Sequence, residues 1–158
     1  MKITIICVGK LKEKYLKDAI SEYTKRLTRF AKVEIIELAD KKIPDNAGEK
    51  LEKQVLLTEG NAILSKIKDD SYVVAMCIEG KLVSSENLAE IVNNAAIKKG
   101  HMTIIIGGSL GLDERVKNRA NEKISFGRIT LPHQLMRVVL CEQLYRAFKI
   151  NANETYHK

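Results

Sequence analysis

Short apolar runs alternate with longer, more polar segments along the chain, and the runs are rich in β-branched residues. Runs of this kind between breaker residues are typical of strands. The uninterrupted run "ITIICV" is typical of a strand that is buried on both faces. The pattern predicts strands at residues 3–8, 33–38, 72–78 and 102–108, the last with a glycine turn, and a weaker fifth strand within residues 123–131.

Apolar residues between these runs recur every three or four positions, which is the spacing of one helix face. The expected helices span residues 14–30, 51–67, 84–99 and 113–122, and the last one begins near Pro132. Ser84 or Ser85 is expected to cap the start of the third helix, and Gly100 its end. Residues 39–50 are polar and rich in helix breakers, so they are predicted to form an exposed loop.

The elements follow the order βαβαβαβαβα, without an internal repeat or a linker. Strands that are separated by helices pair in parallel through right-handed crossovers. We therefore expect one α/β domain over residues 1–158, with ligand sites beyond the carboxyl ends of its strands.

The composition is that of an ordinary globular protein, with 158 residues, 45% of them hydrophobic and 30% charged. The 27 Lys and Arg residues exceed the 20 Asp and Glu residues, which gives a formal net charge of +7. This excess favours contact with a polyanion such as nucleic acid, because cationic side chains release counterions from phosphates. Alternatively, the excess charge provides only solubility.

Cys7, Cys77 and Cys141 lie far apart in apolar runs and lack the spacing of a disulfide framework or a zinc site. Unpaired thiols suit a reducing compartment. The first residues contain no signal-peptide cleavage site, and no apolar stretch is long enough to span a bilayer. We therefore expect a cytoplasmic protein that makes no membrane contact.

Glycine-containing turns are expected after the third, fourth and fifth strands, at residues 78–80, 107–111 and 126–128, with the third strand ending at Glu79-Gly80-Lys81. If these strands are neighbours, the turns line one crevice, where glycine lets the backbone approach a ligand closely. Alternatively, each glycine only turns the chain. "GGSLGL" lacks the G-x-G-x-x-G spacing of a dinucleotide site, and no P-loop, zinc-protease or serine-hydrolase motif occurs.

The last helix presents a broad apolar surface, wide enough to cover both the sheet and a second subunit. Its members are Leu135, Val138, Val139, Cys141, Leu144, Tyr145 and Phe148. Glu142 and Arg146 are one helical turn apart, which on spacing alone indicates a solvated ion pair. His133 is expected to pack or cap, and the final residues 156–158 would ordinarily form a frayed end.

The segment "TLPHQLMRVVLCEQLYRA" follows "IIIGGSLGL" and precedes a terminal "YHK". This long motif resembles the ribosomal RNA large-subunit methyltransferase H family, which are pseudouridine N3-methyltransferases of the SPOUT class, and the resemblance runs the length of the chain. It implies a single-domain, Rossmann-like SPOUT fold with a C-terminal trefoil knot. Periodicity alone does not predict a knot, because threaded chains are rare.

The resemblance also implies S-adenosylmethionine as the methyl donor, no metal, and a homodimer that methylates large-subunit rRNA within the ribosome. The residues expected to bind the donor are Met76, Gly107, Gly108, Gly127, Arg128, Ile129, Thr130, Leu131 and Pro132. Glu142, Arg146, Tyr156 and His157 match the family's functional positions. His157 or Glu142 is assigned to proton removal, Arg146 to the base or a phosphate, and Tyr156 to positioning. Tyr156 and His157 are expected to reach the donor site of the partner subunit.

The sequence departs from many relatives at Ile78-Glu79, where they carry an Asp, and at residues 151–155, which lack their Gly-Glu-Pro. These departures concern the ribose contacts and the path of the tail. Three alternatives remain open: a ribosome-binding protein that has kept the fold without the chemistry, a dinucleotide-dependent oxidoreductase, and a SPOUT enzyme that acts on transfer RNA.

Overall fold

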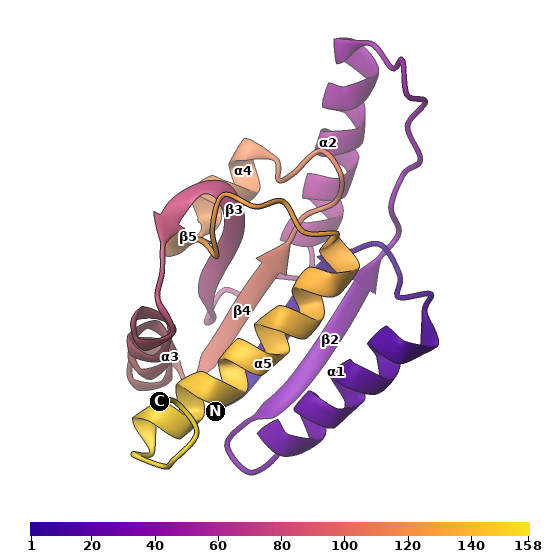
Figure 1. Cartoon of the computed structure of the whole chain (residues 1–158). Helices are drawn as coiled ribbons and strands as arrows, with labels where there is room; N and C mark the ends of the chain where they lie inside the picture. Colours follow the sequence, from indigo (N-terminus) through magenta and orange to yellow (C-terminus); the bar gives the residue numbers. More distant parts are fainter.

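Five parallel strands form one sheet in the spatial order β2-β1-β4-β3-β5 (Figure 1). The computed structural model describes all 158 residues. The strands are β1 (Lys2–Val8), β2 (Lys32–Leu38), β3 (Tyr72–Leu82), β4 (His101–Ile106) and β5 (Glu122–Ser125). The helices are α1 (Lys14–Leu27), α2 (Glu49–Leu64), α3 (Ser85–Lys99), α4 (Glu114–Arg119) and α5 (His133–Asn151). Every neighbouring pair of strands is parallel, as the alternation of strands and helices predicts.

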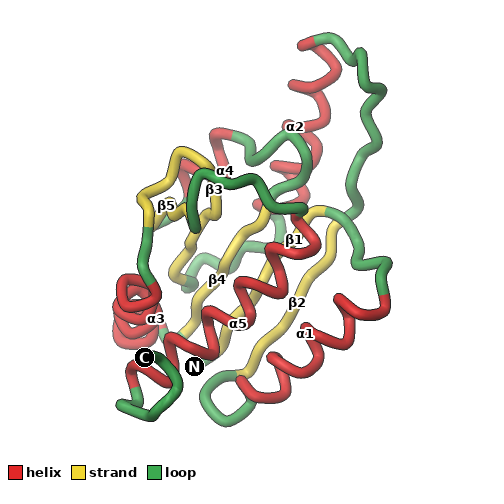
Figure 2. The backbone as a smooth tube through the Cα atoms, in the orientation of Figure 1, coloured by secondary structure: helices red, strands yellow, loops and turns green.

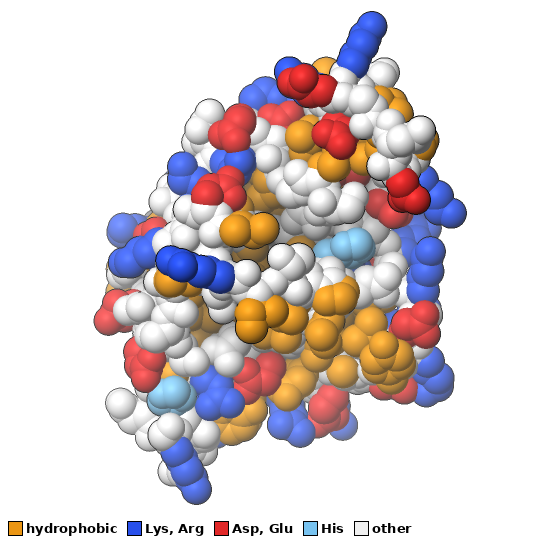
Figure 3. Space-filling model, turned by 45° about the horizontal axis from the view of Figure 1, so that its top comes forward, with side chains coloured by type: hydrophobic (Ala, Val, Ile, Leu, Met, Phe, Trp, Pro, Cys, Tyr) orange, Lys and Arg blue, Asp and Glu red, His pale blue; other side chains and the backbone are white.

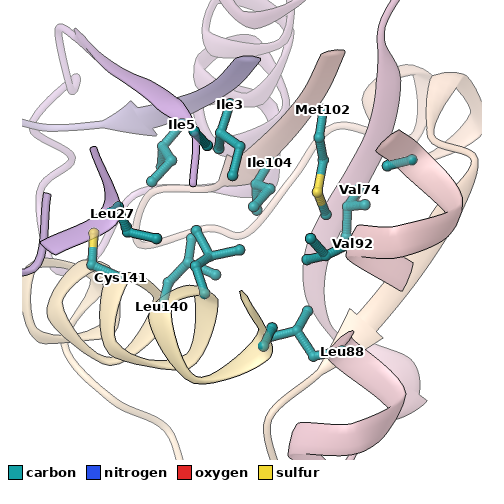
Figure 4. Close-up of a cluster of buried hydrophobic side chains, with 14 of the residues drawn as sticks. Ile3, Ile5, Leu27, Val74, Leu88, Val92, Met102, Ile104, Leu140 and Cys141 are labelled. Carbon is teal, nitrogen blue, oxygen red and sulfur yellow. The ribbon is translucent and has the colours of Figure 1, made fainter. Parts of the chain in front are cut away.

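Helices cover both faces of the sheet (Figure 2). On one face α1, α3 and α5 bury the larger core cluster, which includes Leu27, Leu88 and Leu140 at 1% exposure or less. Figure 4 shows Leu140 between the other two leucines, facing the isoleucines of the central strands. On the other face α2 and α4 contribute Ile63 and Val116 to a smaller cluster. Burial on both faces explains why the central strands read as uninterrupted apolar runs.

The predicted end of β3 is wrong. The strand continues through Glu79-Gly80-Lys81 to Leu82, and its pairing with β5 is irregular along this extension. Gly80 permits the extension, since a Cβ at this position would lie only 2.6 Å from the carbonyl carbon of Ile124 in β5. The glycine that was expected to turn the chain instead lets two strands approach closely, a contact that depends on a residue far away in the sequence.

Other predicted boundaries shift by a few residues. α1 ends at Leu27 rather than at residue 30, and α2 begins at Glu49, inside the predicted loop. α4 ends at Arg119, and Glu122 begins β5 instead of closing the helix. The spacing of apolar residues locates the ends of a helix poorly, because the backbone groups of the terminal turns lack partners within the helix and the ends fray.

The predicted ends of α3 are confirmed, with Ser84 as the capping residue. The Ser84 hydroxyl accepts a hydrogen bond from the amide of Asn87 at 3.1 Å, and the Asn87 side chain accepts one from the amide of Ser84 at 3.2 Å. Gly100 ends the helix in the left-handed conformation, with φ 66°. These caps fix where the chain leaves β3 and where it enters β4.

Both termini lie beside the end of α5, whereas the loops that follow β4 and β5 lie near its beginning (Figure 1). α5 therefore spans the distance between the loops that carry the expected donor-binding residues and the C-terminal tail that carries Tyr156 and His157. None of the five helices combines the length and the apolar character that crossing a membrane requires.

Candidate active site

The turn after β4 brings its backbone unusually close to its neighbours. A Cβ on Gly107 would lie 2.5 Å from the carbonyl oxygen of Gly111, and a Cβ on Gly108 would lie 3.1 Å from a methyl carbon of Val8 in β1. The amide of Gly111 also donates to the carbonyl of Gly108 at 3.1 Å, which closes the turn. Side chains other than hydrogen do not fit at Gly107 without movement of the backbone, so glycine is required there.

Met76 connects this turn with the end of β5. It pairs with Ile106, the residue before the turn, and with Ile124, two residues before Phe126. β4, β3 and β5 are therefore neighbours, the condition on which the predicted crevice depended. Met76 lies beside the ends of β4 and β5, although β3 itself continues to Leu82.

The segment 127–132, here called the donor run, begins at Gly127 with φ 140°, a conformation that favours glycine. The Ser125 hydroxyl fixes its first residue: it donates to the Gly127 carbonyl at 2.9 Å and accepts from the Gly127 amide at 3.3 Å. The run ends at Pro132, which caps α5. A Cβ on Gly127 would meet no atom within 4 Å, so the backbone here faces open space that a ligand can fill.

Exposed apolar side chains gather at this edge. Ile129 of the donor run is 83% exposed, Ile78 and Leu82 of β3 are 74% and 57% exposed, and Leu135 of α5 is 39% exposed. Figure 3 shows hydrophobic side chains gathered on the face that includes this edge, with many of the charged side chains around them. Apolar side chains exposed to this extent are suited to contact with another molecule.

The second group of candidate residues centres on Glu142 in α5. One carboxylate oxygen accepts from the Arg146 guanidinium at 2.7 Å and from the Tyr156 hydroxyl at 3.1 Å. The other carboxylate oxygen accepts from the side-chain amide nitrogen of Gln143 at 2.7 Å. The side-chain oxygen of Gln143 in turn accepts from the Ser85 hydroxyl at 2.7 Å. Three donors therefore hold the Glu142 carboxylate, and the predicted Glu142–Arg146 pair is the centre of a network rather than an isolated surface pair.

Burial of Tyr156 and its bond to the Glu142 carboxylate raise the pKa of the phenol, so the hydroxyl stays a donor at neutral pH. The hydrogen bond to Glu142 also raises the pKa of Arg146 above its already high value. The Tyr156 ring lies under the Arg146 guanidinium, 4.7 Å from its central carbon, in cation–π contact. The tail is thus packed on α5 rather than frayed.

His157 completes the second group. Its Nδ1 lies 3.4 Å from the Arg146 guanidinium, and its Nε2 lies 2.7 Å from a carboxylate oxygen of Glu86 in α3. An arginine only donates, so this geometry leaves the lone pair on Nδ1 and places the proton on Nε2, towards Glu86. Hydrogen bonds from its own backbone amide, from Ser84 and from His157 lower the pKa of Glu86 to about 2, so it is an anion at neutral pH.

Within one chain the two groups are attached to α5 at different places. The donor run precedes the first residue of α5, whereas Tyr156 and His157 follow its last. A helix of 19 residues is about 28 Å long at 1.5 Å per residue. The structure brings Glu142, Arg146, Tyr156 and His157 together, and it brings the donor-binding residues together, but the tail and the donor run lie at opposite ends of the helix.

Sequence reasoning missed three features of these groups: Arg137, which is 1% exposed, the bond between Ser85 and Gln143, and Glu86 as the partner of His157. All three depend on contacts between residues distant in the chain. Only Arg137 left a signal in the sequence: it lies one helical turn before Cys141, a spacing that puts a charged residue on the inward face of α5. His133, which was expected to pack or cap, lies near Gly9, at 3.3 Å from the position of a Cβ there.

Candidate metal ligands are not clustered: no three His, Cys, Asp or Glu side chains are placed to hold an ion. The three cysteines are free, and Cys7 and Cys141 are buried. Burial raises the pKa of both thiols to about 12, so they are packing residues and not nucleophiles.

Comparison with known proteins places this geometry in a family. Residues 1–157 match the family described as predicted SPOUT methyltransferase. The chain is 58% identical to the ribosomal RNA large subunit methyltransferase H of Clostridium novyi, 57% identical to that of Streptococcus pneumoniae and 54% identical to that of Bifidobacterium adolescentis. Each of these alignments covers 100% of both chains.

Proposed function

The chain belongs to the SPOUT methyltransferase family, and on that premise we propose that it methylates N3 of a pseudouridine in large-subunit ribosomal RNA, with S-adenosylmethionine as donor. It is a methyltransferase, and relatives identical at more than half of their positions are named for ribosomal RNA of the large subunit. The observation that carries the proposal is the pair of residue groups on α5: a glycine-edged space at one end, and Glu142 with Arg146, Tyr156 and His157 towards the other.

The donor fits the edge formed by Met76, the turn at Gly107-Gly108 and the donor run. Glycines leave the backbone uncovered by side chains at these positions, and open space lies beside Gly127. S-adenosylmethionine, when bound, supplies an activated methyl group, so the protein's task is to align a nitrogen with it. Backbone recognition also explains why the sequence shows no side-chain fingerprint for a donor.

The C-terminal part is proposed to form the trefoil knot of the family. β5 is an edge strand, yet α5 begins beside the end of β1, where His133 and Arg137 contact Gly9. The donor run must therefore cross the ends of β3 and β4, next to the loop that follows β4. A knot requires in addition that the chain pass through that loop, and this is the path proposed here.

A homodimer would unite the two groups. The tail and the donor run of one chain are separated by the length of α5, so two antiparallel copies of this helix would place each tail at the partner's donor run. The exposed Ile129 and Leu135 are suited to such an interface. The basic charge of each chain, +7, would then be doubled along one RNA-binding surface.

The reaction requires that N3 of the base lose its proton. His157 suits the role of proton acceptor if the base takes the place of Arg146 at Nδ1, where the contact is long at 3.4 Å, while Glu86 fixes the opposite nitrogen. The Glu142 carboxylate, which already accepts from three donors, suits the role of holding Arg146 and Tyr156 in place. Arg146 then stabilises the anionic base or contacts a phosphate.

The test is methyl transfer to ribosomes purified from a strain that lacks the modification. We expect one labelled nucleoside in large-subunit rRNA, identified as N3-methylpseudouridine, and no label in transfer RNA. The assembled large subunit should be a better substrate than free rRNA, because a small basic protein reads mainly the shape of folded RNA. Label in transfer RNA alone, or calorimetric binding of NAD in place of S-adenosylmethionine, would refute the proposal.

A further inference from the structure

Arg137 is the largest fully buried side chain of the protein, at 1% exposure. Its Nη2 donates to the carbonyl oxygen of Val8, the last residue of β1, at 3.1 Å and to that of Gly9, the next residue, at 2.6 Å. Its Nη1 donates to Glu37 of β2 at 2.8 Å. The guanidinium therefore ties the start of α5 to the carboxyl ends of β1 and β2.

Packing alone does not explain an arginine at this position. Its Nε is the one buried side-chain nitrogen or oxygen in the structure without a hydrogen-bond partner. An unpaired buried donor costs free energy, and an apolar side chain of similar volume is often equally stable or more stable in place of a buried ion pair. A residue that costs stability and remains fully buried points to a requirement other than stability.

The contacts of Arg137 lead to both segments that are proposed to bind the donor. The donor run has a fixed start, because Ser125 binds Gly127, but from there to its end at Pro132 its residues are mostly exposed. Its far end is held only through the first turns of α5, where Arg137 makes the buried bonds. The Arg137 bonds therefore decide where the run ends.

Val8 connects the same arginine to the second segment. Its carbonyl accepts from Arg137, and its side chain lies 3.1 Å from the position of a Cβ on Gly108. One residue at the end of β1 thus contacts both the anchor of the donor run and the turn after β4. The separation of the two segments depends on this shared contact.

We propose that Arg137 is a positioning residue for the donor site: it holds the donor run at a fixed separation from the Gly107-Gly108 turn. The inference rests on the proposed function, because it takes these two segments as the donor site. Glu37 supports the arrangement by orienting the guanidinium, and it also accepts from the amide of Leu11 at 2.8 Å. No contact between Arg137 and the RNA or the transferred methyl group is implied.

The test is calorimetric binding of S-adenosylmethionine to the full chain and to Arg137→Met, Arg137→Lys and Leu27→Ala. Leu27 is fully buried and precedes the amino end of β2, whereas Arg137 bonds to residues at the carboxyl ends of β1 and β2, so Leu27→Ala controls for lost stability. Losing the buried bonds in Arg137→Met should raise the Kd about 10- to 100-fold. The Kd of Arg137→Lys should lie between those of the wild type and Arg137→Met, because lysine can reach the carbonyl oxygens but lacks the two-pronged donor geometry of the guanidinium. Leu27→Ala should bind like the wild type.

A second readout needs no ligand. Hydrogen exchange of the amides in residues 128–131 should accelerate in Arg137→Met and stay unchanged in Leu27→Ala, because Arg137 holds the far end of the donor run and Leu27 makes no bond to that end. Equal Kd values for wild type and Arg137→Met would overturn the inference, as would equal losses of affinity in Arg137→Met and Leu27→Ala. If Arg137→Met does not fold, the Kd and the hydrogen exchange of Arg137→Lys are compared with those of the wild type and Leu27→Ala in its place. Failure of the wild type to bind S-adenosylmethionine would instead overturn the proposed function itself.

Discussion

The hydroxyl of Tyr156 donates to the carboxylate of Glu142 at 3.1 Å, which joins the last residues of the chain to the middle of its last helix. The Tyr156 ring also packs edge-on against Tyr145, with ring centroids 5.0 Å apart. A tail that is held by a hydrogen bond and an aromatic contact has a defined position. This position makes the roles of the tail and of α5 testable one residue at a time.

Glu142→Gln should abolish most methyl transfer and leave the binding of S-adenosylmethionine intact. The amide keeps the size of the side chain but loses the ion pair with Arg146, so the arginine and Tyr156 are no longer held together. Removing a group of this kind typically costs about 10²- to 10⁴-fold in rate. The matched control is Glu49→Gln, which breaks the exposed pair with Lys53 at the same i, i+4 spacing and should not change the rate. Near-normal turnover of Glu142→Gln would contradict the assignment.

Two inactive variants should restore activity when they are mixed as refolded dimers. Gly107→Ala disturbs the turn after β4 that is proposed to bind the donor, since its Cβ would lie 2.5 Å from the Gly111 carbonyl oxygen, and His157→Ala removes the tail imidazole. If each tail serves the partner's donor site, half of the randomly assembled dimers are mixed and one of their two sites is intact, so about a quarter of the wild-type rate returns. If each tail serves its own chain, the mixture stays inactive.

Gly80→Ala should destabilise the protein and separate β3 from β5. The added Cβ would lie 2.6 Å from the Ile124 backbone, which cannot give way as a flexible side chain can. Overpacking of this kind costs about 1–3 kcal/mol, measurable by denaturant unfolding. The control is Gly48→Ala, where a Cβ meets no atom within 4 Å and φ is −74°. Equal stability of the two variants would show that β3 and β5 pair less closely in solution.

Glu59→Gln should stabilise the protein at neutral pH and not in acid. Glu59 is 7% exposed beside Gly108, and burial raises its pKa above the ordinary 4.5. A raised pKa means that the folded state favours the protonated carboxyl. The protonated carboxyl therefore contributes to the free energy of unfolding below pH 4.5, and this contribution is lost as the pH rises through the pKa of the folded state. The amide of the variant does not titrate, so it has no such loss.

Thermal unfolding of wild type and Glu59→Gln across this pH range is the measurement. Their melting temperatures should converge below pH 4.5 and separate at neutral pH, with the variant higher. The exposed Glu90→Gln serves as control and should follow the wild type at every pH. A variant that is less stable at neutral pH would indicate that the Glu59 carboxylate has a cationic partner.

Alkylation of the native protein should modify Cys77 before the other two cysteines. Cys77 is half-buried, and burial raises its pKa too, whereas Cys7 and Cys141 are buried and their pKa values are raised to about 12. The thiolate is the reactive form, so the two core cysteines should react only after denaturation. Mass spectrometry of iodoacetamide-treated protein before and after unfolding checks the order. Modification of Cys7 in the native state would contradict the packing of β1 against α5.

The alternation of apolar runs and helical segments was sufficient to predict the five strands, the five helices and the parallel sheet, because burial on one or both faces leaves a local period in the sequence. Ser84 and Gly100 were predictable for a similar reason, since caps act on backbone groups a few residues away. The motif from Thr130 to Ala147 identified the family without a structure.

Contacts between distant residues were decided only by the tertiary structure. Gly80 was expected to end a strand and instead lies against Ile124, and Arg137 carried no signal of the carbonyls that it binds at Val8 and Gly9. The partners of His157, Glu86 in α3 and Arg146 in α5, are likewise brought to it by folding. A sequence records the local periodicity that burial imposes, whereas the partner of a buried polar group depends on how whole elements cross, which no local pattern encodes.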